Sequence, residues 1–306
     1  MPNELADVRA ALLAWYAGSK RDFPWRRTSD PYAVLVSEVM LQQTQASRVV
    51  ERFPRFMARF PTAQALADAD AADVLVEWSG LGYNRRAVAL QAAAIHVAAR
   101  GWPRDVETLQ RLPGVGPYTA RAIASLAFGV PAGVVDTNVR RWVTRRFGVE
   151  TRRELQSLAD ALASAGDPAD AAPDAASWTH AGMEFGAAIC RSRRPACHAC
   201  PIADGCPSAG ADRGAPSRRT PVFRGSRRAY RGALLRALTA APRRRLRLTD
   251  GARQLADRSP SIGPALSGEQ FSEIVRSLVD DGLAVVEGRE LRLGSHRPLE
   301  SPSARR

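Results

Sequence analysis

Lysine is almost absent from this sequence of 306 residues: Lys20 is the single lysine among 44 basic side chains, and arginine supplies the rest. An enzyme that attacks its substrate with an amine would therefore have almost no candidate nucleophile. Apolar runs of about 18 residues are also missing, so we expect no membrane-spanning segment. The N-terminus has acidic residues and no basic start before an apolar run. We therefore expect no secretory signal and a cytoplasmic protein.

Acidic residues are the minority among the charged side chains, because 31 Asp and Glu leave a formal net charge of +13. Such an excess favours a polyanionic partner, of which nucleic acid is the usual one. A solvated basic surface without a partner is the alternative that charge alone leaves open. The hydrophobic fraction of 45% is typical of a globular protein with a buried core.

Cysteine occurs at four positions, all in one short stretch: Cys190, Cys197, Cys200 and Cys206. In a cytoplasmic protein such a cluster indicates metal ligands rather than disulfides. Four thiolates from one loop suit either a tetrahedral zinc ion or a four-iron cluster, and general spacing rules leave both open. The loop also contains three arginines, at 191, 193 and 194, which could contact phosphate.

Helix signals dominate the first two thirds of the chain, and no convincing strand occurs before residue 230, so we predict a mainly all-α fold. Asp30 followed by Pro31 predicts a helix that runs to about Gln43. Further helices are predicted to begin after Asp70, after Tyr83, after Asp105, at Pro117 and after Asp136.

The composition changes after the cysteine cluster. Residues 207–228 are rich in Gly, Pro, Ser and Arg, which is typical of a linker. In the small unit that follows, at 229–306, we expect a helix near 230–240, a short strand at RLRL, and a helix opened by a Ser267–Gln270 capping box. Two short strands around Glu287 complete a C-terminal α/β module that we interpret as winged-helix-like.

Two carboxylates have environments of opposite kind. Glu38 shares a helical stripe with Val34, Leu35 and Leu41, and burial there should raise its pKa and make it a usable general acid. A partly buried ion pair with Arg26 is the alternative for Glu38.

Asp136, in contrast, stands where a helix begins. There it should accept backbone N–H groups and stay ionised. A plain N-cap is the alternative for Asp136. One acid and one anion are together the pair that glycosidic chemistry needs.

Glycines in Leu112–Gly116 (LPGVG) predict a tight turn between two helices, with backbone N–H groups next to the helix N-terminus at Pro117. Such a turn can bind a phosphate oxygen without reading sequence. A turn with no ligand is the more frequent case for glycines between helices.

Several motifs in a fixed order carry a resemblance to a known family. They are FPWR at 23–26, SEVMLQQTQ at 37–45, GLGY at 80–83 and VDTNV at 135–139. With the LPGVG turn and the cysteine spacing, they resemble the MutY-type adenine DNA glycosylases of the helix-hairpin-helix, or endonuclease III, superfamily. The resemblance covers roughly residues 5–207. It implies the helix-hairpin-helix glycosylase fold and one [4Fe-4S] cluster in the cysteine loop.

The resemblance also implies a role for each matching residue. Glu38 would be the general acid, and Asp136, held by Tyr118 and Asn138, would stabilise the sugar cation. The adenine pocket would be lined by Arg26, Leu41, Gln43 and Glu184. The DNA contacts would come from Gln42, Thr44, Tyr83, Gly114, Val115 and Gly116, with Gln42 and Tyr83 as a wedge in the duplex. Core packing is the alternative for Tyr83.

The implied activity is base excision repair: monofunctional hydrolysis of the N-glycosidic bond of adenine mispaired with 8-oxoguanine or guanine in double-stranded DNA. Little or no lyase activity is expected, because Tyr118 stands near the position where the lyase relatives carry lysine. A monomer associated with the nucleoid is expected. The implied division is 1–27 with 133–206 around the cluster, and 28–132 as a six-helix module with the hairpin.

The sequence also departs from the family. Asn84 follows Tyr83 where many members have tyrosine, and residues 177–184 match the family only loosely. The β-rich, Nudix-like domain with which many members read 8-oxoguanine has no good counterpart in the short C-terminal module. Three alternatives remain: a thymine or uracil mismatch glycosylase of the same superfamily, a non-catalytic DNA-binding protein on this scaffold, and a zinc-stabilised regulator with a winged-helix tail.

Overall fold

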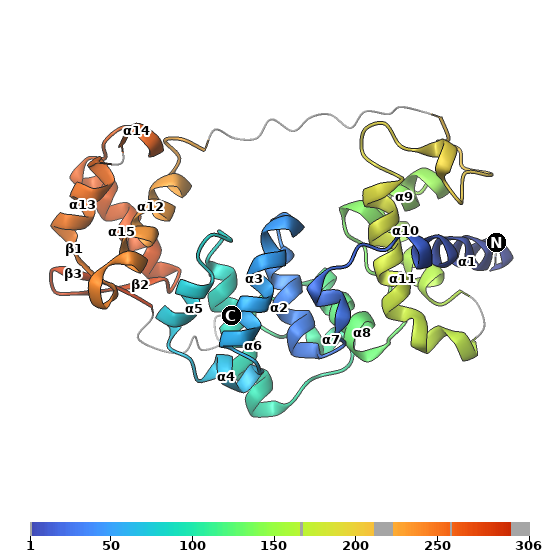
Figure 1. The fold of residues 1–306 in the computed structure, drawn as a ribbon, viewed down its shortest axis with the longest axis horizontal. Helices are drawn as coiled ribbons and strands as arrows, with labels where there is room; N and C mark the ends of the chain where they lie inside the picture. Colours follow the sequence, from blue (N-terminus) through green and yellow to red (C-terminus); the bar gives the residue numbers. More distant parts are fainter. Residues whose placement is uncertain (1, 166–167, 211–222, 258, 295–306) are drawn as a thin grey trace. The chain divides into compact units, whose positions relative to one another are not determined.

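The computed structural model describes residues 2–165, 168–210, 223–257 and 259–294, and Figure 1 shows it as a ribbon. Contacts between residues divide the chain into two compact units, which we call unit 1 (residues 1–38 and 102–218) and unit 2 (39–101 and 219–306). The boundary falls inside helix α2 (Pro31–Leu41), between Glu38 and Val39. Each unit is described by itself below.

Unit 1 is helical in its described residues. Besides the start of α2, its elements are α1 (Pro2–Ser19), η1 (Pro24–Arg27), α7 (Val106–Leu109), α8 (Pro117–Phe128), α9 (Thr137–Phe147), α10 (Arg152–Ala163), α11 (Pro168–Ala188) and η2 (Cys197–Ala199). Helix α11 packs against α1, α8, α9 and α10. Its Trp178 and Phe185 meet Trp142 of α9 edge to face, and these three side chains form the centre of an apolar core.

The ends of the unit 1 helices follow from local chemistry. Asp136 caps α9 as the sequence predicts, and Gly116 precedes Pro117 at the start of α8. Helices α8 and α9 end at Gly129 and Gly148, which adopt left-handed φ values of 68° and 70°. Glycine enters this region without the penalty that a Cβ atom brings.

The N-terminal part of unit 2 is also helical. After the last residues of α2 come α3 (Ala46–Arg59), α4 (Ala63–Ala67), α5 (Ala71–Glu77) and α6 (Arg85–Arg100). Helix α4 packs along α6, and Phe56, Phe60 and Trp78 form a fully buried aromatic cluster. The predicted cap of α5 is confirmed, because the side chain of Asp70 accepts the N–H of Ala72 at 2.7 Å.

The C-terminal part of unit 2 has the predicted α/β composition. Its elements are α12 (Arg227–Ala240), η3 (Pro242–Arg244), β1 (Arg245–Arg247), α13 (Leu248–Asp257), α14 (Ser259–Ile262), α15 (Gly268–Asp280), β2 (Ala284–Glu287) and β3 (Glu290–Leu293). The strands form an antiparallel sheet in the order β1–β3–β2, as expected for a winged-helix-like module. The Ser267–Gln270 capping box at the start of α15 is present. These are the strands of the described residues, so the expectation of none before residue 230 holds for that part of the chain.

The observed units differ from the division expected from the sequence. Residues 102–132 fall in unit 1 instead of with 39–101, because α7 packs on α8 and α8 packs on α11. The C-terminal module falls in unit 2, where α12 and β3 pack on α5 and Arg244 pairs with Asp73 at 2.6 Å. Of the expected linker, residues 211–222 lie outside the described residues.

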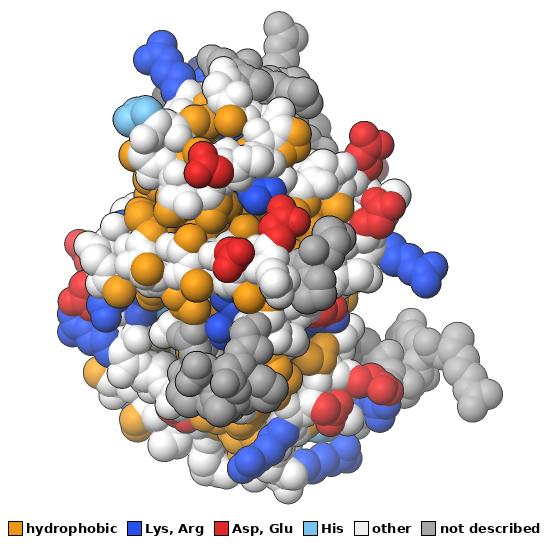
Figure 2. Space-filling view, turned by 90° about the vertical axis from the view of Figure 1, so that its right-hand side faces the viewer, with side chains coloured by type: hydrophobic (Ala, Val, Ile, Leu, Met, Phe, Trp, Pro, Cys, Tyr) orange, Lys and Arg blue, Asp and Glu red, His pale blue; other side chains and the backbone are white. Residues whose placement is uncertain are grey.

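The apolar and charged side chains bear on membrane crossing and on the surface of the protein. In the described part of the chain, no helix is both long and apolar enough to cross a membrane. On the face shown in Figure 2, basic, acidic and apolar side chains are interspersed.

Candidate active site

Glu38 lies within α2 and is 5% exposed, between the fully buried Leu35 and the buried Val39. Burial raises the pKa of Glu38 to about 7, and the negative charge of Asp136 adds to the rise, while a hydrogen bond from the Tyr118 hydroxyl opposes it. The raised pKa predicted from the apolar stripe is thus found. The alternative pairing with Arg26 is not, because Arg26 binds Glu184 instead.

Asp136 accepts three hydrogen bonds at the N-terminus of α9. Its Oδ1 accepts the backbone N–H groups of Asn138 at 2.9 Å and Val139 at 2.6 Å, and its Oδ2 accepts the side-chain amide of Asn138 at 2.8 Å. Burial nevertheless raises the pKa of Asp136, and these hydrogen bonds limit the rise. The sequence predicted the hydrogen bonds but not the extent of burial.

Tyr118, in the first turn of α8, has a different partner from the one expected. Its hydroxyl donates a hydrogen bond to Glu38. Its interaction with Asp136 is electrostatic. Burial raises the pKa of Tyr118 well above its ordinary value, so the phenol stays protonated and can donate to Glu38. Asn138 does hold Asp136, as expected. The two carboxylates therefore have separate supports.

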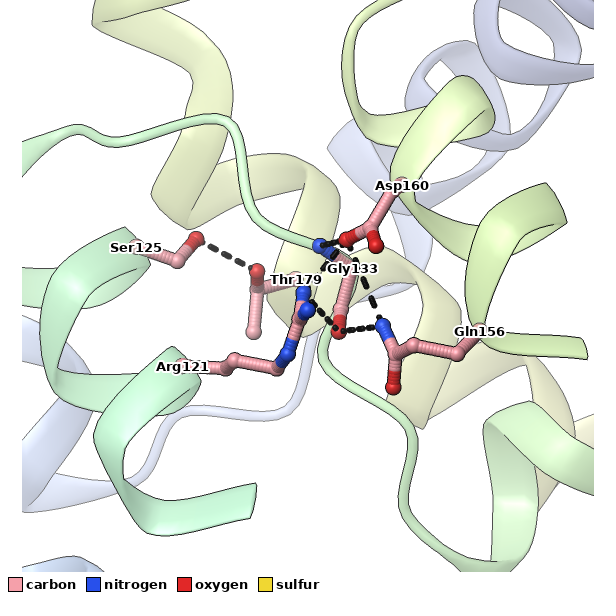
Figure 3. Close-up of polar contacts among 6 residues, drawn as sticks. All are labelled: Arg121, Ser125, Gly133, Gln156, Asp160 and Thr179. Atoms are coloured by element: carbon pink, nitrogen blue, oxygen red, sulfur yellow. Dashed lines mark hydrogen bonds and ion pairs between the residues drawn. The ribbon is translucent and has the colours of Figure 1, made fainter. Parts of the chain in front are cut away.

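The loop that leads into Asp136 is fixed to α10 by the contacts that Figure 3 shows. The N–H of Gly133 donates to Asp160 at 2.8 Å, and its carbonyl accepts from Gln156 at 2.9 Å and from Arg121 at 3.4 Å. Arg121 also pairs with Asp160. A Cβ atom on Gly133 would lie 2.5 Å from the backbone of Ala159, so glycine is required for this approach. The loop before Asp136 is thus held through both the N–H and the carbonyl of Gly133.

A second contact, from Ser125 to Thr179 at 2.7 Å, joins α8 to α11 in the same region (Figure 3). Both side chains are buried, and Ser125 also donates to the carbonyl of Ala175 at 3.0 Å. Buried hydroxyls are tolerated in an apolar core only when they are hydrogen-bonded. This pair therefore ties the helix that carries Tyr118 to the helix that carries Glu184.

Glu184 of α11 is 1% exposed and is held by two arginines. Arg26 donates to its Oε2 at 2.8 Å, and Arg21 pairs with its Oε1. The guanidinium group of Arg26 lies over Phe23, 4.9 Å from the ring centroid. One turn before Glu184, burial and the charge of Arg26 lower the pKa of His180 to about 3, so this imidazole is neutral at physiological pH. The structure brings together Arg26 and Glu184, as expected, and adds Arg21, which the motifs did not indicate.

The cysteine loop is fastened to α9. Arg141 donates to the carbonyl of Cys190 at 2.6 Å and to the side-chain carbonyl of Asn138 at 2.8 Å. One turn later Arg145 donates to the carbonyls of Arg191 at 2.7 Å and Ser192 at 3.2 Å. A chain of contacts therefore leads from the cysteine loop through Arg141 and Asn138 to Asp136. No sequence motif had indicated Arg141.

The four cysteines are free thiols that line one small cavity, together with Ile189, Pro195 and Ala203 among others. Burial raises the pKa of the Cys200 thiol, and the other three cysteines act on it electrostatically. In the described residues no group of three or more His, Cys, Asp or Glu side chains is already set at metal-binding geometry. The donor set, four thiols from one loop around one cavity, nevertheless fits an iron–sulfur cluster or a zinc ion.

The predicted hairpin turn lies between α7 and α8. Gly114 adopts a left-handed φ of 73°, and Gly114 and Gly116 are exposed. Val115 has its side chain buried, and its N–H donates to the carbonyl of Leu112 at 3.1 Å. The N–H of Val115 is thus already used inside the turn, which leaves the backbone of the two exposed glycines as the accessible part.

In unit 2, the residues expected to contact DNA depend on one arginine. Arg86, at the start of α6, donates to the carbonyls of Val39 at 2.7 Å and Met40 at 3.0 Å, and to the side chain of Thr44 at 3.0 Å. It also donates to the carbonyls of Gln42, Leu81 and Gly82. Burial lowers the pKa of Arg86 to about 10, which leaves it charged at neutral pH.

Arg86 therefore fixes both the end of α2 and the turn that carries Tyr83. Gln43 and Tyr83 have φ values of 54° and 48°, in a region that costs a residue with a Cβ atom about 1 kcal/mol. Tyr83 is 45% exposed, so the core-packing alternative for this ring is wrong. Leu41 and Gln42 are half-buried and Gln43 is exposed.

Comparison with known proteins identifies the family. Residues 36–164 match the model of the HhH-GPD superfamily base excision DNA repair proteins. The adenine DNA glycosylase of Mycolicibacterium smegmatis is 44% identical over 239 residues, which cover 74% of this chain and 78% of that protein. The human adenine DNA glycosylase is 42% identical over 66% of this chain and 39% of its own length.

Solved structures agree on the fold. A thermostable thymine-DNA glycosylase superposes with a TM-score of 0.61 at 29% identity, over 67% of this chain and 96% of its own. An endonuclease III bound to DNA superposes with a TM-score of 0.56 at 22% identity, over 68% and 96%. The protein is thus a helix-hairpin-helix protein of base excision repair. Within that superfamily, the chain belongs to the MutY-type adenine DNA glycosylase family.

Proposed function

We propose that this protein is a monofunctional DNA glycosylase that hydrolyses the N-glycosidic bond of adenine mispaired with 8-oxoguanine or guanine. The observation that carries the proposal is a pair of carboxylates in unit 1, one buried (Glu38) and one half-buried (Asp136). Glu38 has a pKa of about 7 and is hydrogen-bonded to a phenol, whereas Asp136 is hydrogen-bonded to a helix N-terminus. Curated relatives named adenine DNA glycosylase, at 42–44% identity, support the same reaction.

The division of labour follows from the two environments. Near neutral pH a substantial fraction of Glu38 is protonated, so it can transfer a proton to N7 of a purine flipped out of the duplex. The base then leaves as a neutral molecule, and the sugar passes through an oxocarbenium-like state. Asp136, with its negative charge fixed by three hydrogen bonds, stabilises that cation. Glu38, now ionised, takes a proton from the attacking water, and the cycle closes.

Tyr118 and Asn138 each position one carboxylate in this scheme. The Tyr118 hydroxyl orients Glu38 and keeps its pKa from rising further. Asn138 orients Asp136. With Lys20 as the single lysine of the chain, we assign no Schiff base and therefore little or no lyase activity to the protein.

Adenine selection is assigned to Glu184, with Arg26 and Arg21 fixing its carboxylate in one orientation. A buried carboxylate held in this way can accept a hydrogen bond from an exocyclic amino group, which thymine and uracil lack. Leu41 and Gln43 are proposed to contribute to adenine selection, as the family resemblance implies. Because His180 is neutral, it adds no positive charge that would compete with the base for the Glu184 carboxylate.

DNA binding is assigned to the hairpin, the cysteine loop and the Tyr83 turn. The exposed backbone at Gly114 and Gly116 can bind a phosphate, and Gln42, Thr44 and Tyr83 can enter the duplex. We propose a [4Fe-4S] cluster on the four cysteines, whose bound form would stiffen the arginine-bearing loop. We further propose that the protein acts as a cytoplasmic, nucleoid-associated monomer.

The experiment that tests the function is a base-release assay on duplexes that pair A, T or U with G or 8-oxoguanine. Release of adenine alone is expected, with intact strands until alkali is added. Thymine or uracil release instead would favour the mismatch glycosylase, to whose thermostable relative the fold is also similar. If no base were released from any of these duplexes, a non-catalytic DNA-binding role would replace the proposal.

The cofactor has a separate test. The purified protein should absorb broadly near 400 nm, roughly where iron–sulfur charge transfer falls. A colourless protein with one zinc ion per chain would overturn the cluster assignment.

A further inference from the structure

An exposed row of aromatic and cationic side chains lies where the C-terminal module of unit 2 meets the Tyr83 turn. The side chains of Tyr83 and Phe223 are 45% and 49% exposed, which is unusual for large apolar rings. Arg228 lies between them in the network of contacts. Its guanidinium carbon is 5.8 Å from the ring centroid of Tyr83 and 5.3 Å from that of Phe223, and it donates to the Tyr83 hydroxyl at 3.0 Å.

Two members of this row, Tyr83 and Arg228, are held by neighbouring structure. Arg86 holds the backbone of the Tyr83 turn, and its guanidinium carbon lies 5.5 Å from the Tyr83 ring centroid. Arg228 lies in the first turn of α12, whose N-cap Ser226 accepts the N–H of Ala229 at 3.3 Å. The ring therefore has one arginine from α6 and one from α12 as neighbours.

The C-terminal module is attached to the helices around Tyr83 by other contacts. Arg244 pairs with Asp73 at 2.6 Å, and Arg85 reaches Asp281 at 3.4 Å. Gly294 approaches Ala72 so closely that a Cβ atom on it would lie 3.2 Å from the Ala72 nitrogen. The position of Arg228 relative to Tyr83 thus depends on a docked interface within unit 2.

The chemistry of the row suits an unstacked nucleobase. Aromatic rings and guanidinium planes both stack on bases, and a half-exposed ring has apolar area to bury. Among the ion pairs of the described residues Arg228 has no carboxylate partner, so its charge is not neutralised within this part of the protein. A surface that binds a protein would more often contain acidic side chains as well, or a wider apolar area.

We propose that Arg228 and Phe223 extend the Tyr83 wedge into a stacking platform for the base that loses its partner when a nucleotide is flipped out, and that Arg228 holds Tyr83 in place for it. This inference rests on the proposed function, since it requires an opened duplex. It gives the C-terminal module a direct part in distorting DNA. Arg228 and Phe223 then act beside Tyr83, although they are more than 130 residues away in sequence.

The test compares two duplexes that need no chemistry. The first has a tetrahydrofuran abasic analogue opposite guanine, and the second has the analogue on both strands, so that the unpaired base is missing. Arg228→Ala should weaken binding to the first duplex by about tenfold and leave binding to the second nearly unchanged. Phe223→Leu should act in the same direction. Arg236→Ala, which removes the same charge from an exposed position on α12, is the matched control and should affect both duplexes equally.

Two further variants separate stacking from charge and from folding. Arg228→Lys keeps the charge but loses the planar group, so it should also lose the preference for the unpaired guanine. Tyr83→Phe keeps the ring and removes only the hydroxyl that accepts from Arg228, so it should weaken the preference less than Arg228→Ala does. An equal loss on both duplexes for Arg228→Ala would reduce Arg228 to a phosphate contact and overturn the proposal, as would no loss at all.

Failure of the platform and failure of the proposed function give different results. If the wild-type protein prefers the unpaired guanine and the variants lose that preference, the platform stands even if no adenine is released from intact duplex. If adenine is released normally and the preference is the same in every variant, the glycosylase stands and the platform is wrong.

Discussion

Glu38 and Asp136 differ in both burial and hydrogen bonding. Glu38 is buried and Asp136 is half-buried, and burial is the leading cause of a raised pKa at each. Glu38 receives one hydrogen bond, from a phenol, in the middle of an apolar helix. Asp136 receives three, two of them from the N-terminus of α9. Deeper burial with a single donor takes the pKa of Glu38 to about 7, whereas three donors limit the rise at the less buried Asp136.

This difference shows how one protein can hold an acid and an anion close to each other. Two equivalent buried carboxylates would share one proton and titrate as a pair. Here the helix N-terminus favours ionisation at Asp136, and the negative charge of Asp136 raises the pKa of Glu38 further. Ionisation of Asp136 therefore widens the difference between the pKa values of the two carboxylates. Each contribution to this difference can be removed separately by substitution.

The largest effect should come from Glu38→Gln, which keeps the shape of the side chain and removes the transferable proton. General acid catalysis is typically worth 10²–10⁴-fold, so single-turnover adenine release should fall by at least about 100-fold. Binding to the mispaired duplex should change little. An undiminished release rate in the variant would show that Glu38 is not the acid.

Asp136→Asn tests the other half of the comparison. The amide can still cap α9 through its oxygen, but it has no charge to stabilise the sugar cation, so release should fall by roughly 10²–10³-fold. The matched measurement is thermal unfolding, which separates lost chemistry from a weakened cap. If the variant were less stable but fully active per folded molecule, the plain N-cap interpretation of Asp136 would be correct.

The caps and the apolar stripe were predictable because each depends on residues within one helical turn. Asp70, Asp136 and Ser267 are N-cap residues that the local sequence predicts, and Glu38 lies between apolar residues at helical spacing. The hydrogen bond from Tyr118 to Glu38 was not predictable in the same way, because it joins helices about 80 residues apart in sequence.

The residues that sequence reasoning missed are mostly arginines. Arg21, Arg86 and Arg141 bond to groups brought near them by the fold, many of them backbone carbonyls, which no side-chain pattern reveals. Because arginine is so common in this chain, the presence of an arginine at one position does not indicate a functional role. Gly133 was missed for a similar reason, since the close approach of α10 that requires it is a tertiary contact.

Arg141→Ala should have an intermediate effect, because it acts on Asp136 through Asn138. Losing the bond to Asn138 frees the amide that orients the carboxylate, and losing the bond to Cys190 loosens the cysteine loop. We expect adenine release to fall by about tenfold, the size of one positioning hydrogen bond to a charged group. Arg140→Ala, an exposed neighbour on the same helix, is the control.

A structural role alone for Arg141 would lower the melting temperature without changing release by the folded protein. Arg141→Lys should be a poor rescue, because lysine cannot reach both acceptors with a planar fork. Full activity of Arg141→Ala per folded molecule would break the link between the cysteine loop and Asp136.

The smallest effect, and the sharpest test of the asymmetry, is expected from Tyr118→Phe. The hydroxyl hydrogen bond lowers the pKa of Glu38 against the effect of burial, so its removal should raise that pKa above about 7. Glu38 acts as an acid only while protonated, and activity is therefore lost as pH rises through its pKa. The alkaline limb of the pH profile for single-turnover release should move to higher pH in the variant, while the plateau rate at lower pH falls only a few-fold. Each unit of displacement corresponds to about 1.4 kcal/mol of lost stabilisation of the carboxylate. A limb that stayed in place would mean that the hydrogen bond does not set the pKa of Glu38, and a limb that moved to lower pH would mean that the phenol stabilises the protonated acid instead. Either result would require another explanation for why the two carboxylates have different pKa values.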